Sequence, residues 1–254
     1  MFPQAWQVGL DIQIDCVRAV AAQRRRNGWQ LRHWWQQALP QAVLRDGCLE
    51  PSEFLIRALR QWRVQLPRHI SLRIALPAQR VLQQRMAQPD VRLREPERSD
   101  YIGGHGVKQF PLDGQTLALD YRTAPADEAA LLLTAARRQE LQQWLHCLRQ
   151  AGLHPQAVDI TPCALRMMAT AAGVPPAAGL MHRLEREWLW VAPADGAFAF
   201  GLAPGDDDAQ AGALPAGCLA WSPLSAFTQL RPPLPAHPSA FALAGGLALR
   251  EEDR

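Results

Sequence analysis

The residues with the clearest chemical potential lie near the N-terminus, in segment 8–20, V-G-L-D-I-Q-I-D-C-V-R-A-V. The segment has the form of a hairpin that holds phosphate, in which a glycine admits the phosphate and turn N–H groups bind its oxygens. Asp11 stands in the first strand, as such a hairpin requires. Gln13 replaces the glycine, however, and Asp15 adds a negative charge beside any polyphosphate. The segment therefore predicts a hairpin frame that has lost its phosphate chemistry.

The other candidate chemical groups favour structure over catalysis. Asp206, Asp207 and Asp208 could hold a divalent cation, but adjacent side chains diverge, so we expect a solvated turn. No motif pairs a cysteine with a histidine as nucleophile and base. Residues 102–106, I-G-G-H-G, lack the lysine and hydroxyl residue of a phosphate loop and predict a mobile turn. We expect no catalytic residue, no metal site and no cofactor.

Composition indicates an ordinary soluble chain with a sizeable core. Of its 254 residues, 48% are hydrophobic and 20% are charged. No apolar run reaches the length of about 18 residues that a membrane-spanning helix needs, and the N-terminus does not resemble a secretory signal. Five cysteines at irregular spacing form neither a disulfide framework nor a zinc pattern. We therefore expect a reducing, cytoplasmic environment.

Charge gives little support for nucleic-acid binding. The formal net charge is +3, and Lys108 is the only lysine, so the basic residues are almost all arginine. They are spread along the chain, as a compositional bias would spread them, although an arginine-rich surface is the alternative. The run Arg24, Arg25 and Arg26 is expected at the edge of a hairpin. We expect no direct contact with nucleic acid.

Periodicity and turn residues predict a mixed α/β order of elements. Asp46-Gly47 is expected to form a turn, and Asp195-Gly196 a hairpin connection. Strands are expected at 5–12, 16–23, 29–35, 72–76, 116–122, 129–135, 154–160, 187–192 and 196–202, and helices at 50–62, 137–152, from Pro162, and at 241–250.

Several stretches resemble the type IV pilus assembly protein PilM family, and within it the enterobacterial HofM branch, labelled a DNA utilization protein. The most specific stretch is A-A-R-R-Q-E-L-Q-Q-W-L-H-C-L-R-Q-A-G-L-H-P-Q-A-V-D-I-T-P-C-A-L at 135–165. The others are G-L-D-I at 9–12, Q-F-P-L-D-G-Q-T-L-A-L-D-Y at 109–121, E-W-L-W-V at 187–191 and P-S-A-F-A-L-A-G-G-L-A-L-R at 238–250. The likeness extends over nearly the whole chain.

The resemblance implies an actin-like α/β fold, with two ribonuclease H-like halves, related to the bacterial division protein FtsA. It also implies a small α/β subdomain inserted in the first half. We map the first actin-like subdomain to residues 1–84 plus 161–175, the inserted subdomain to 85–160, and a reduced second half to 176–254.

The departures from the family pattern concern nucleotide binding. The second half should open with another phosphate hairpin, but residues 180–186, L-M-H-R-L-E-R, contain neither an aspartate nor a glycine. Gly245 and Gly246 fall inside a helical pattern, which favours close packing over an adenosine loop. Nucleotide binding is therefore not carried over from the family, and Asp11, Gln13 and Asp15 are interpreted as a vestigial phosphate loop.

The resemblance implies a non-enzymatic scaffold on the cytoplasmic face of the bacterial inner membrane. Its partner would be the bitopic protein PilN, HofN in this branch, held by a cytoplasmic N-terminal peptide. Phe110, Pro111 and Leu112 are expected to border the binding groove beside the insertion, or else to form a buried turn. Arg137 and Arg138 could meet acidic groups of the partner, or begin a solvated helix. Membrane contact is expected only through the partner, and the sequence does not indicate an oligomeric state.

Two other functions stay open from the sequence. The chain could be an ATP-binding actin-like pilus assembly ATPase with an unusual loop around Asp11, in which backbone N–H groups replace the missing residues. It could also bind DNA directly through arginine, but it lacks a basic cluster with interleaved aromatic residues.

Overall fold

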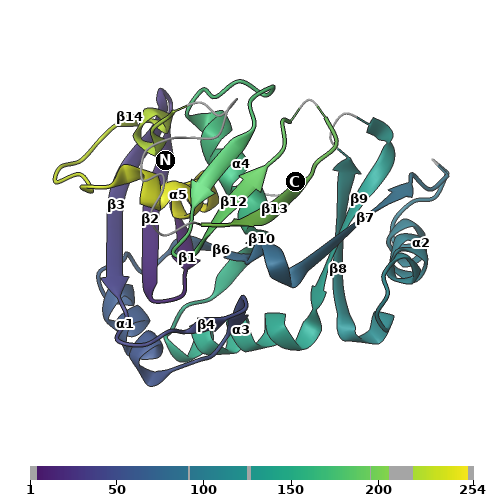
Figure 1. Cartoon of the computed structure of the whole chain (residues 1–254), viewed down its shortest axis with the longest axis horizontal. Coiled ribbons are helices and arrows are strands. Elements are labelled where there is room, and N and C mark those ends of the chain that lie inside the picture. Colours follow the sequence, from purple (N-terminus) through teal and green to yellow (C-terminus); the bar gives the residue numbers. More distant parts are fainter. Residues whose placement is uncertain (1–4, 91, 125–126, 195, 206–219, 251–254) are drawn as a thin grey trace.

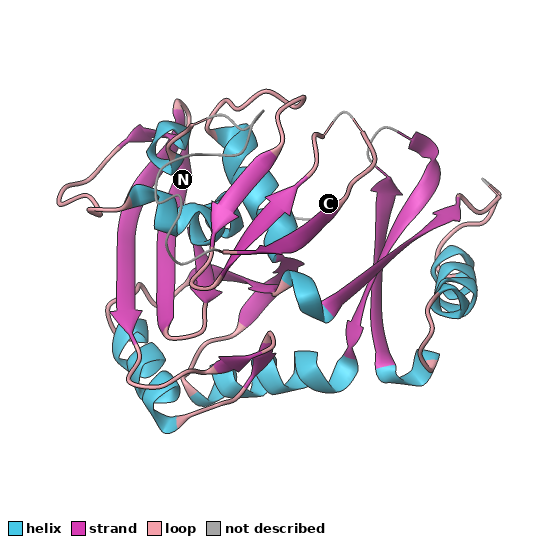
Figure 2. Ribbon diagram, viewed as in Figure 1, coloured by secondary structure: helices cyan, strands magenta, loops and turns pink. Residues whose placement is uncertain are grey.

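The structure is a computed structural model that describes residues 5–90, 92–124, 127–194, 196–205 and 220–250. Figure 1 shows a large sheet on the left, a small sheet with its own helix on the right, and a third sheet above and between them. Figure 2 shows that helices cover the large sheet on both faces. In the described residues, no helix is both long and apolar enough to span a bilayer.

The largest sheet has six strands in the order β10-β6-β1-β2-β3-β14. The antiparallel pairs β1–β2 and β2–β3 form the predicted N-terminal meander, and Ile12 pairs with Val17 across its first turn. Parallel pairing joins β1 to β6, β6 to β10 and β3 to β14. The strands are β1 (Trp6–Ile12), β2 (Cys16–Arg25), β3 (Gly28–Ala38), β6 (Ile70–Leu76), β10 (Pro155–Ile160) and β14 (Phe227–Gln229).

Helices α1 (Glu53–Arg63) and α3 (Arg138–Gln150) cover one face of this sheet. Ser52 caps α1, since its hydroxyl accepts a hydrogen bond from the Leu55 amide at 3.2 Å. One side of α1 is buried, and Trp62 on that side stacks on Trp35 of β3 with 5.1 Å between ring centroids. The predicted amphipathic helices are confirmed at both places.

Helices α4 (Thr161–Ala171) and α5 (Ala242–Leu249) cover the opposite face. All of α5 is buried between β1 and α4. A Cβ atom at Gly246 would collide with the carbonyl oxygen of Ala164, and one at Gly9 would collide with that of Ala244. The small residues of α5 therefore serve close packing, as the sequence predicted.

A second, three-stranded sheet has the order β7-β9-β8 and packs against α2. Residues 102–106 were predicted to be a mobile turn, and this prediction is wrong because they continue α2, where Ile102 is fully buried against the sheet. The buried side of β9 provides the apolar surface that holds this glycine-rich helix. The elements are β7 (Val81–Ala87), α2 (Glu97–Gly106), β8 (Leu117–Ala124) and β9 (Asp127–Arg137).

A third sheet is an antiparallel meander of β11 (Leu180–Arg183), β12 (Glu187–Val191) and β13 (Phe200–Pro204). A two-stranded ribbon, β4 (Leu44–Arg45) and β5 (Cys48–Leu49), closes on the predicted turn, where Asp46 and Gly47 have φ values of 50° and 76°. Short 3₁₀ helices are η1 (Ala78–Arg80), η2 (Val107–Gln109), η3 (Gly114–Thr116), η4 (Pro223–Ala226) and η5 (Pro238–Phe241).

The sheets divide the chain differently from the predicted boundaries. The segment mapped as an insertion, 85–160, ends in β10, which pairs with β6 of the six-stranded sheet, and α3 packs on that sheet too. The segment mapped as a second half, 176–254, contains β14 and α5, which also join the six-stranded sheet. Composition marks changes of local character, whereas long-range pairing decides which sheet a strand joins. Independent folding of these parts stays a prediction.

Candidate functional site

The first turn of the meander holds the three residues interpreted as a vestigial phosphate loop. Asp11 is buried, and Gln13 Nε2 donates a hydrogen bond to its Oδ1 at 2.7 Å. Burial raises the pKa of Asp11 to about 7, against the opposing effects of Gln13 and Arg18. Asp15 is exposed at the tip of the turn. The Gln13 amide thus occupies the space beside Asp11 that a phosphate-binding turn leaves open.

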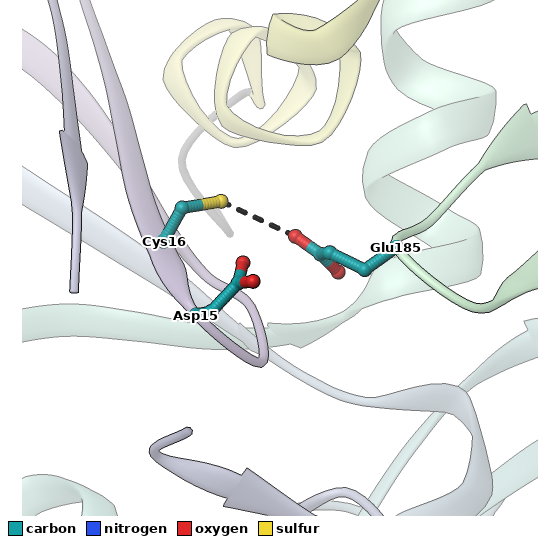
Figure 3. A group of neighbouring side chains, drawn as sticks. All are labelled: Asp15, Cys16 and Glu185. Carbon is teal, nitrogen blue, oxygen red and sulfur yellow. Dashed lines mark hydrogen bonds between the residues drawn. The ribbon is translucent and has the colours of Figure 1, made fainter. Parts of the chain in front are cut away.

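The turn between β11 and β12 faces this first turn and supplies Glu185. Cys16 Sγ donates a hydrogen bond to Glu185 Oε1 at 3.2 Å, and Figure 3 shows the two side chains pointing toward each other from different sheets. Arg18 Nη1 lies 3.7 Å from the same oxygen. The Glu185 carboxylate therefore lies between the two hairpins and pairs with Arg18, the only cation among these contacts.

Electrostatics keep the neighbouring groups neutral. Burial raises the pKa of the Cys16 thiol well above its usual range, so it remains protonated at neutral pH. Burial, and then the charge of Arg18, lowers the pKa of His182 to about 4. A protonated thiol and a neutral imidazole beside an ion pair give no activated nucleophile.

Within the part of the chain that the structure describes, Asp15, Cys16 and Glu185 are a group that could hold a metal ion, since their ligand atoms lie within 4.8 Å of one another. This donor set is unfavourable for a cation, because Arg18 already neutralises Glu185 and the thiol would have to lose its proton. Asp206, Asp207 and Asp208, the other group considered from the sequence, lie outside the described residues.

A cavity of about 280 Å³ opens beside the two turns, and we call it the turn cleft. Gln13, Thr161 and Glu185 line it. Its charged lining is mainly acidic, since two arginines face four carboxylates. Such a lining repels a polyphosphate. The charged residues are Arg45, Asp46, Glu50, Glu185, Arg186 and Glu187.

A cavity of about 1000 Å³, which we call the groove, runs between the β7-β9-β8 sheet and the six-stranded sheet with α4. Residues 118–122 of β8 form one wall. Among the described strands, β8 pairs only with β9, so its other edge leaves backbone groups unpaired. Apolar side chains form much of the remaining lining: Leu132, Val158, Ile160, Met167 and Phe198.

The charged groups of the groove are only partly neutralised. Arg250 Nε lies 3.2 Å from Asp159 Oδ2. Arg122 Nη2 donates to Cys163 Sγ at 2.7 Å, and its guanidinium lies 5.3 Å from the centroid of the Phe198 ring. Arg166 is held by the backbone carbonyl groups of Ala178 and Ala192. The groove therefore combines apolar walls with a few fixed charged groups, a combination typical of ligand-binding sites.

The residues expected to bind a partner are not brought into this groove. Phe110 is 6% exposed and packs in the cluster between α2 and its sheet, with Leu112 at the edge of that cluster and Pro111 exposed. Arg137 forms an ion pair with Glu140 at 3.7 Å, and Arg138 donates to the Leu117 carbonyl oxygen at 2.6 Å. Their role as partner-binding residues stays a prediction, and Phe110 occupies a core position.

Sequence reasoning missed Glu185 and the groove residues Arg122, Met167 and Phe198. Glu185 carried a usable signal, because it is the only acidic residue between Asp159 and Glu187 and lies in a hairpin turn. The groove carried no such signal, since its walls come from elements separated by many residues.

Known proteins resemble the chain in sequence and in structure. The family described as Type IV pilus assembly protein PilM matches residues 9–178. The DNA utilization protein HofM of Escherichia coli strain K12 is 28% identical over 253 residues, covering 96% of each chain.

Two solved structures carry the comparison of folds. A PilM-PilN type IV pilus biogenesis complex gives a TM-score of 0.61 at 20% identity, covering 80% of this chain and 62% of that one, so this chain spans less than two thirds of its length. The cytoplasmic domain of EpsL, an inner membrane component of the type II secretion system of Vibrio cholerae, gives 0.56 at 11% identity, covering 97% and 96%. The expected actin-like α/β fold is confirmed.

Proposed function

The chain belongs to the type IV pilus assembly protein PilM family, and from this premise we propose that it is a non-enzymatic scaffold that binds a PilN-like membrane protein. The partner's cytoplasmic N-terminal peptide would occupy the groove. Through that peptide the chain would join the inner-membrane platform of a pilus-like or DNA-uptake machine, on its cytoplasmic side. The similarity to the chain of a PilM-PilN complex supports this partner class.

The observation that carries the proposal is the open edge of β8 in the wall of the groove. An extended peptide can add to this edge as a strand, with backbone hydrogen bonds that do not depend on its sequence. Alternate side chains of that strand would then face the apolar lining around Met167 and Phe198, which gives selectivity for apolar residues.

The turn cleft supports a scaffold that does not bind nucleotide. Glu185 places a carboxylate between the hairpins, and Gln13 fills the space beside Asp11. An ATP-binding variant of this function would have to break the Arg18–Glu185 pair and bring a polyphosphate among carboxylates.

The proposal is tested by the affinity of the purified chain for a labelled N-terminal peptide of a PilN-like membrane protein. Phe198→Ala removes an apolar side chain of the groove and should weaken binding about thirtyfold, because losing an aromatic anchor costs about 2 kcal/mol. Fluorescence anisotropy measures the dissociation constant, and circular dichroism checks that the variant is folded.

Phe54→Ala is the matched control, because Phe54 is 48% exposed on α1 and does not line the groove. It should leave the dissociation constant unchanged. Equal affinity of the wild type and the Phe198 variant would remove the groove from the binding function. Absence of binding by the wild type would reject the proposed partner class.

A further inference from the structure

The connection between β2 and β3 presents three consecutive arginines to solvent. Arg25 pairs with Gly28, so only Arg26 and Asn27 link the strands, and Arg24, Arg25 and Arg26 are all exposed. We call these three residues the basic tip. Only Arg24 has a ring contact, with its guanidinium 5.1 Å from the centroid of the Trp29 ring. The side chains of Arg25 and Arg26 form no hydrogen bond, ion pair or ring contact with the described residues.

Most elements around the basic tip contain no acidic residue, and the exceptions are Asp120 and Asp159, which line the groove together with Arg24. Asp and Glu are absent from residues 16–45, which form β2 and β3, and from residues 161–184, which form α4 and β11. They are also absent from residues 220–250, which form β14 and α5. Among the described residues, no carboxylate lies within 4.0 Å of the tip guanidinium groups. This is a local charge imbalance that the small net charge of the whole chain conceals.

Apolar side chains are exposed beside the basic tip. β14 pairs with Trp29 and Gln30, and the loop that follows it exposes Leu230 and Leu234 to 43% and 38%. Trp34 Nε1 donates to the Pro233 carbonyl oxygen at 2.6 Å, which holds this loop on β3. In Figure 1 the loop projects at the left, next to β14 and the upper end of β3.

We propose that the basic tip and Leu230 form a surface for anionic phospholipid headgroups, so that the chain contacts a bilayer directly and not only through a partner. Unpaired guanidinium groups attract anionic headgroups, and an adjacent exposed leucine adds apolar contact at the interface. This inference goes beyond the scaffold function and does not depend on the groove being occupied.

The same charges could attract nucleic acid, but the aromatic residues near the tip argue against it. Single-stranded binding needs free aromatic faces for the bases. Arg24 covers Trp29, while Trp34 packs edge-on against Phe241 with 5.4 Å between ring centroids and bonds to Pro233. Both indole rings are therefore engaged within the protein, which leaves charge and aliphatic surface for a ligand.

The test is co-sedimentation of the full chain with vesicles of phosphatidylglycerol and phosphatidylcholine, compared with phosphatidylcholine alone. The wild type should bind only the anionic vesicles, and less at high salt. Each basic residue near the surface contributes about a fivefold factor. Arg25→Gln combined with Arg26→Gln should therefore lower the partition constant about 25-fold. Arg24 is kept because it lines the groove.

Arg57→Gln combined with Arg68→Gln is the matched control. Both residues are exposed in or just after α1 and outside the basic tip, and the change in net charge is the same. This variant should retain vesicle binding. Leu230→Ser should weaken binding without changing its salt dependence.

Three outcomes would overturn the proposal: no binding of the wild type to anionic vesicles at low salt, an equal loss in the control variant, or full vesicle binding by the tip variant. The last outcome, with loss of oligonucleotide binding, would assign the tip to nucleic acid. Peptide affinity of the same variants reports on the groove separately, so failure of the lipid surface and failure of the scaffold function are distinguishable.

Discussion

The turn cleft and the groove lie in one molecule, yet their polar groups are used in opposite ways. Beside the turn cleft, side chains contact one another: Gln13 donates to Asp11, Cys16 donates to Glu185, and Arg18 forms an ion pair with Glu185. Among the described residues, Arg18 Nε and Glu185 Oε2 are nevertheless buried without a hydrogen-bond partner. In the groove, β8 supplies one wall together with apolar side chains, and one of its edges is unpaired among the described strands. Side chains that contact one another hold two hairpins together, whereas a strand edge with unpaired backbone groups can accept an added strand.

The largest expected effect separates a core aromatic residue from a groove aromatic residue. Phe110→Ala should lower the free energy of unfolding by about 3 kcal/mol, because it leaves a cavity between α2 and its sheet. Peptide affinity of the folded fraction should stay unchanged, in contrast to Phe198→Ala. Denaturant unfolding and anisotropy measure the two quantities. A stable Phe110 variant that no longer binds peptide would move the binding site to residues 110–112.

The next effect tests whether Glu185 stabilises the junction of the two hairpins. Its side chain is 19% exposed and that of Arg18 is 17% exposed, so Glu185→Ala leaves a largely buried cation unpaired. We expect a loss of about 2 kcal/mol in unfolding free energy. Glu50→Ala is the control, since its exposed pair with Arg45 at 3.3 Å should contribute about 0.5 kcal/mol. Equal losses in the two variants would mean that the turn cleft is not a stabilising junction.

The pH dependence of the unfolding free energy tests the two buried titratable groups Asp11 and His182. Asp11 has a folded pKa of about 7, above its unfolded value, so its contribution is present at low pH and is lost as pH rises through 7. His182 has a folded pKa of about 4, below its unfolded value, so its contribution is lost as pH falls through 4. Between about pH 4 and 6.5 the two slopes oppose each other, each at most about 1.4 kcal/mol per pH unit.

Removing either group should therefore leave the slope of stability against pH that the other group produces, and the two variants should show slopes of opposite sign. Asp11→Asn should leave stability rising with pH in this window, whereas His182→Gln should leave it falling. Chemical denaturation at a series of pH values measures both. Flat profiles in both variants would show that neither group titrates with a perturbed pKa.

The smallest expected effect is the response to nucleotide. Because carboxylates line the turn cleft and Glu185 is bonded in place, titration with Mg-ATP should give no heat of binding. Isothermal calorimetry at moderate salt is the measurement. A dissociation constant near 10 μM, about −7 kcal/mol, would favour an ATP-binding protein and remove the contrast between cleft and groove.

Local sequence patterns predicted most elements correctly. Strand alternation predicted the N-terminal meander, and apolar spacing after residue 50 predicted α1, which begins at Glu53 behind a Ser52 cap. The prediction of a turn at 102–106 was wrong because its glycines suggest a turn, whereas the burial of Ile102 against β9 makes the segment helical. Tertiary packing there overrides local propensity.

Long-range assembly could not be predicted from the same patterns. Nothing local in Phe227–Gln229 indicates that it extends the sheet beside β3, nor that Glu185 meets Cys16 across two hairpins. Phe110 illustrates the same limit, because an aromatic residue beside a proline is equally compatible with a groove edge and a core. Such contacts depend on how whole sheets pack, which a segment does not encode alone.

The burial of α5 has a consequence for biosynthesis. This helix fills the space beside β1, yet the ribosome synthesises it long after β1. The nascent chain must hold its first hairpin with an uncovered apolar face until residue 249 emerges, which favours late, cooperative folding and exposes the unfinished sheet to aggregation. Chaperone dependence during translation should therefore concentrate on β1 and β2 until α5 has been synthesised.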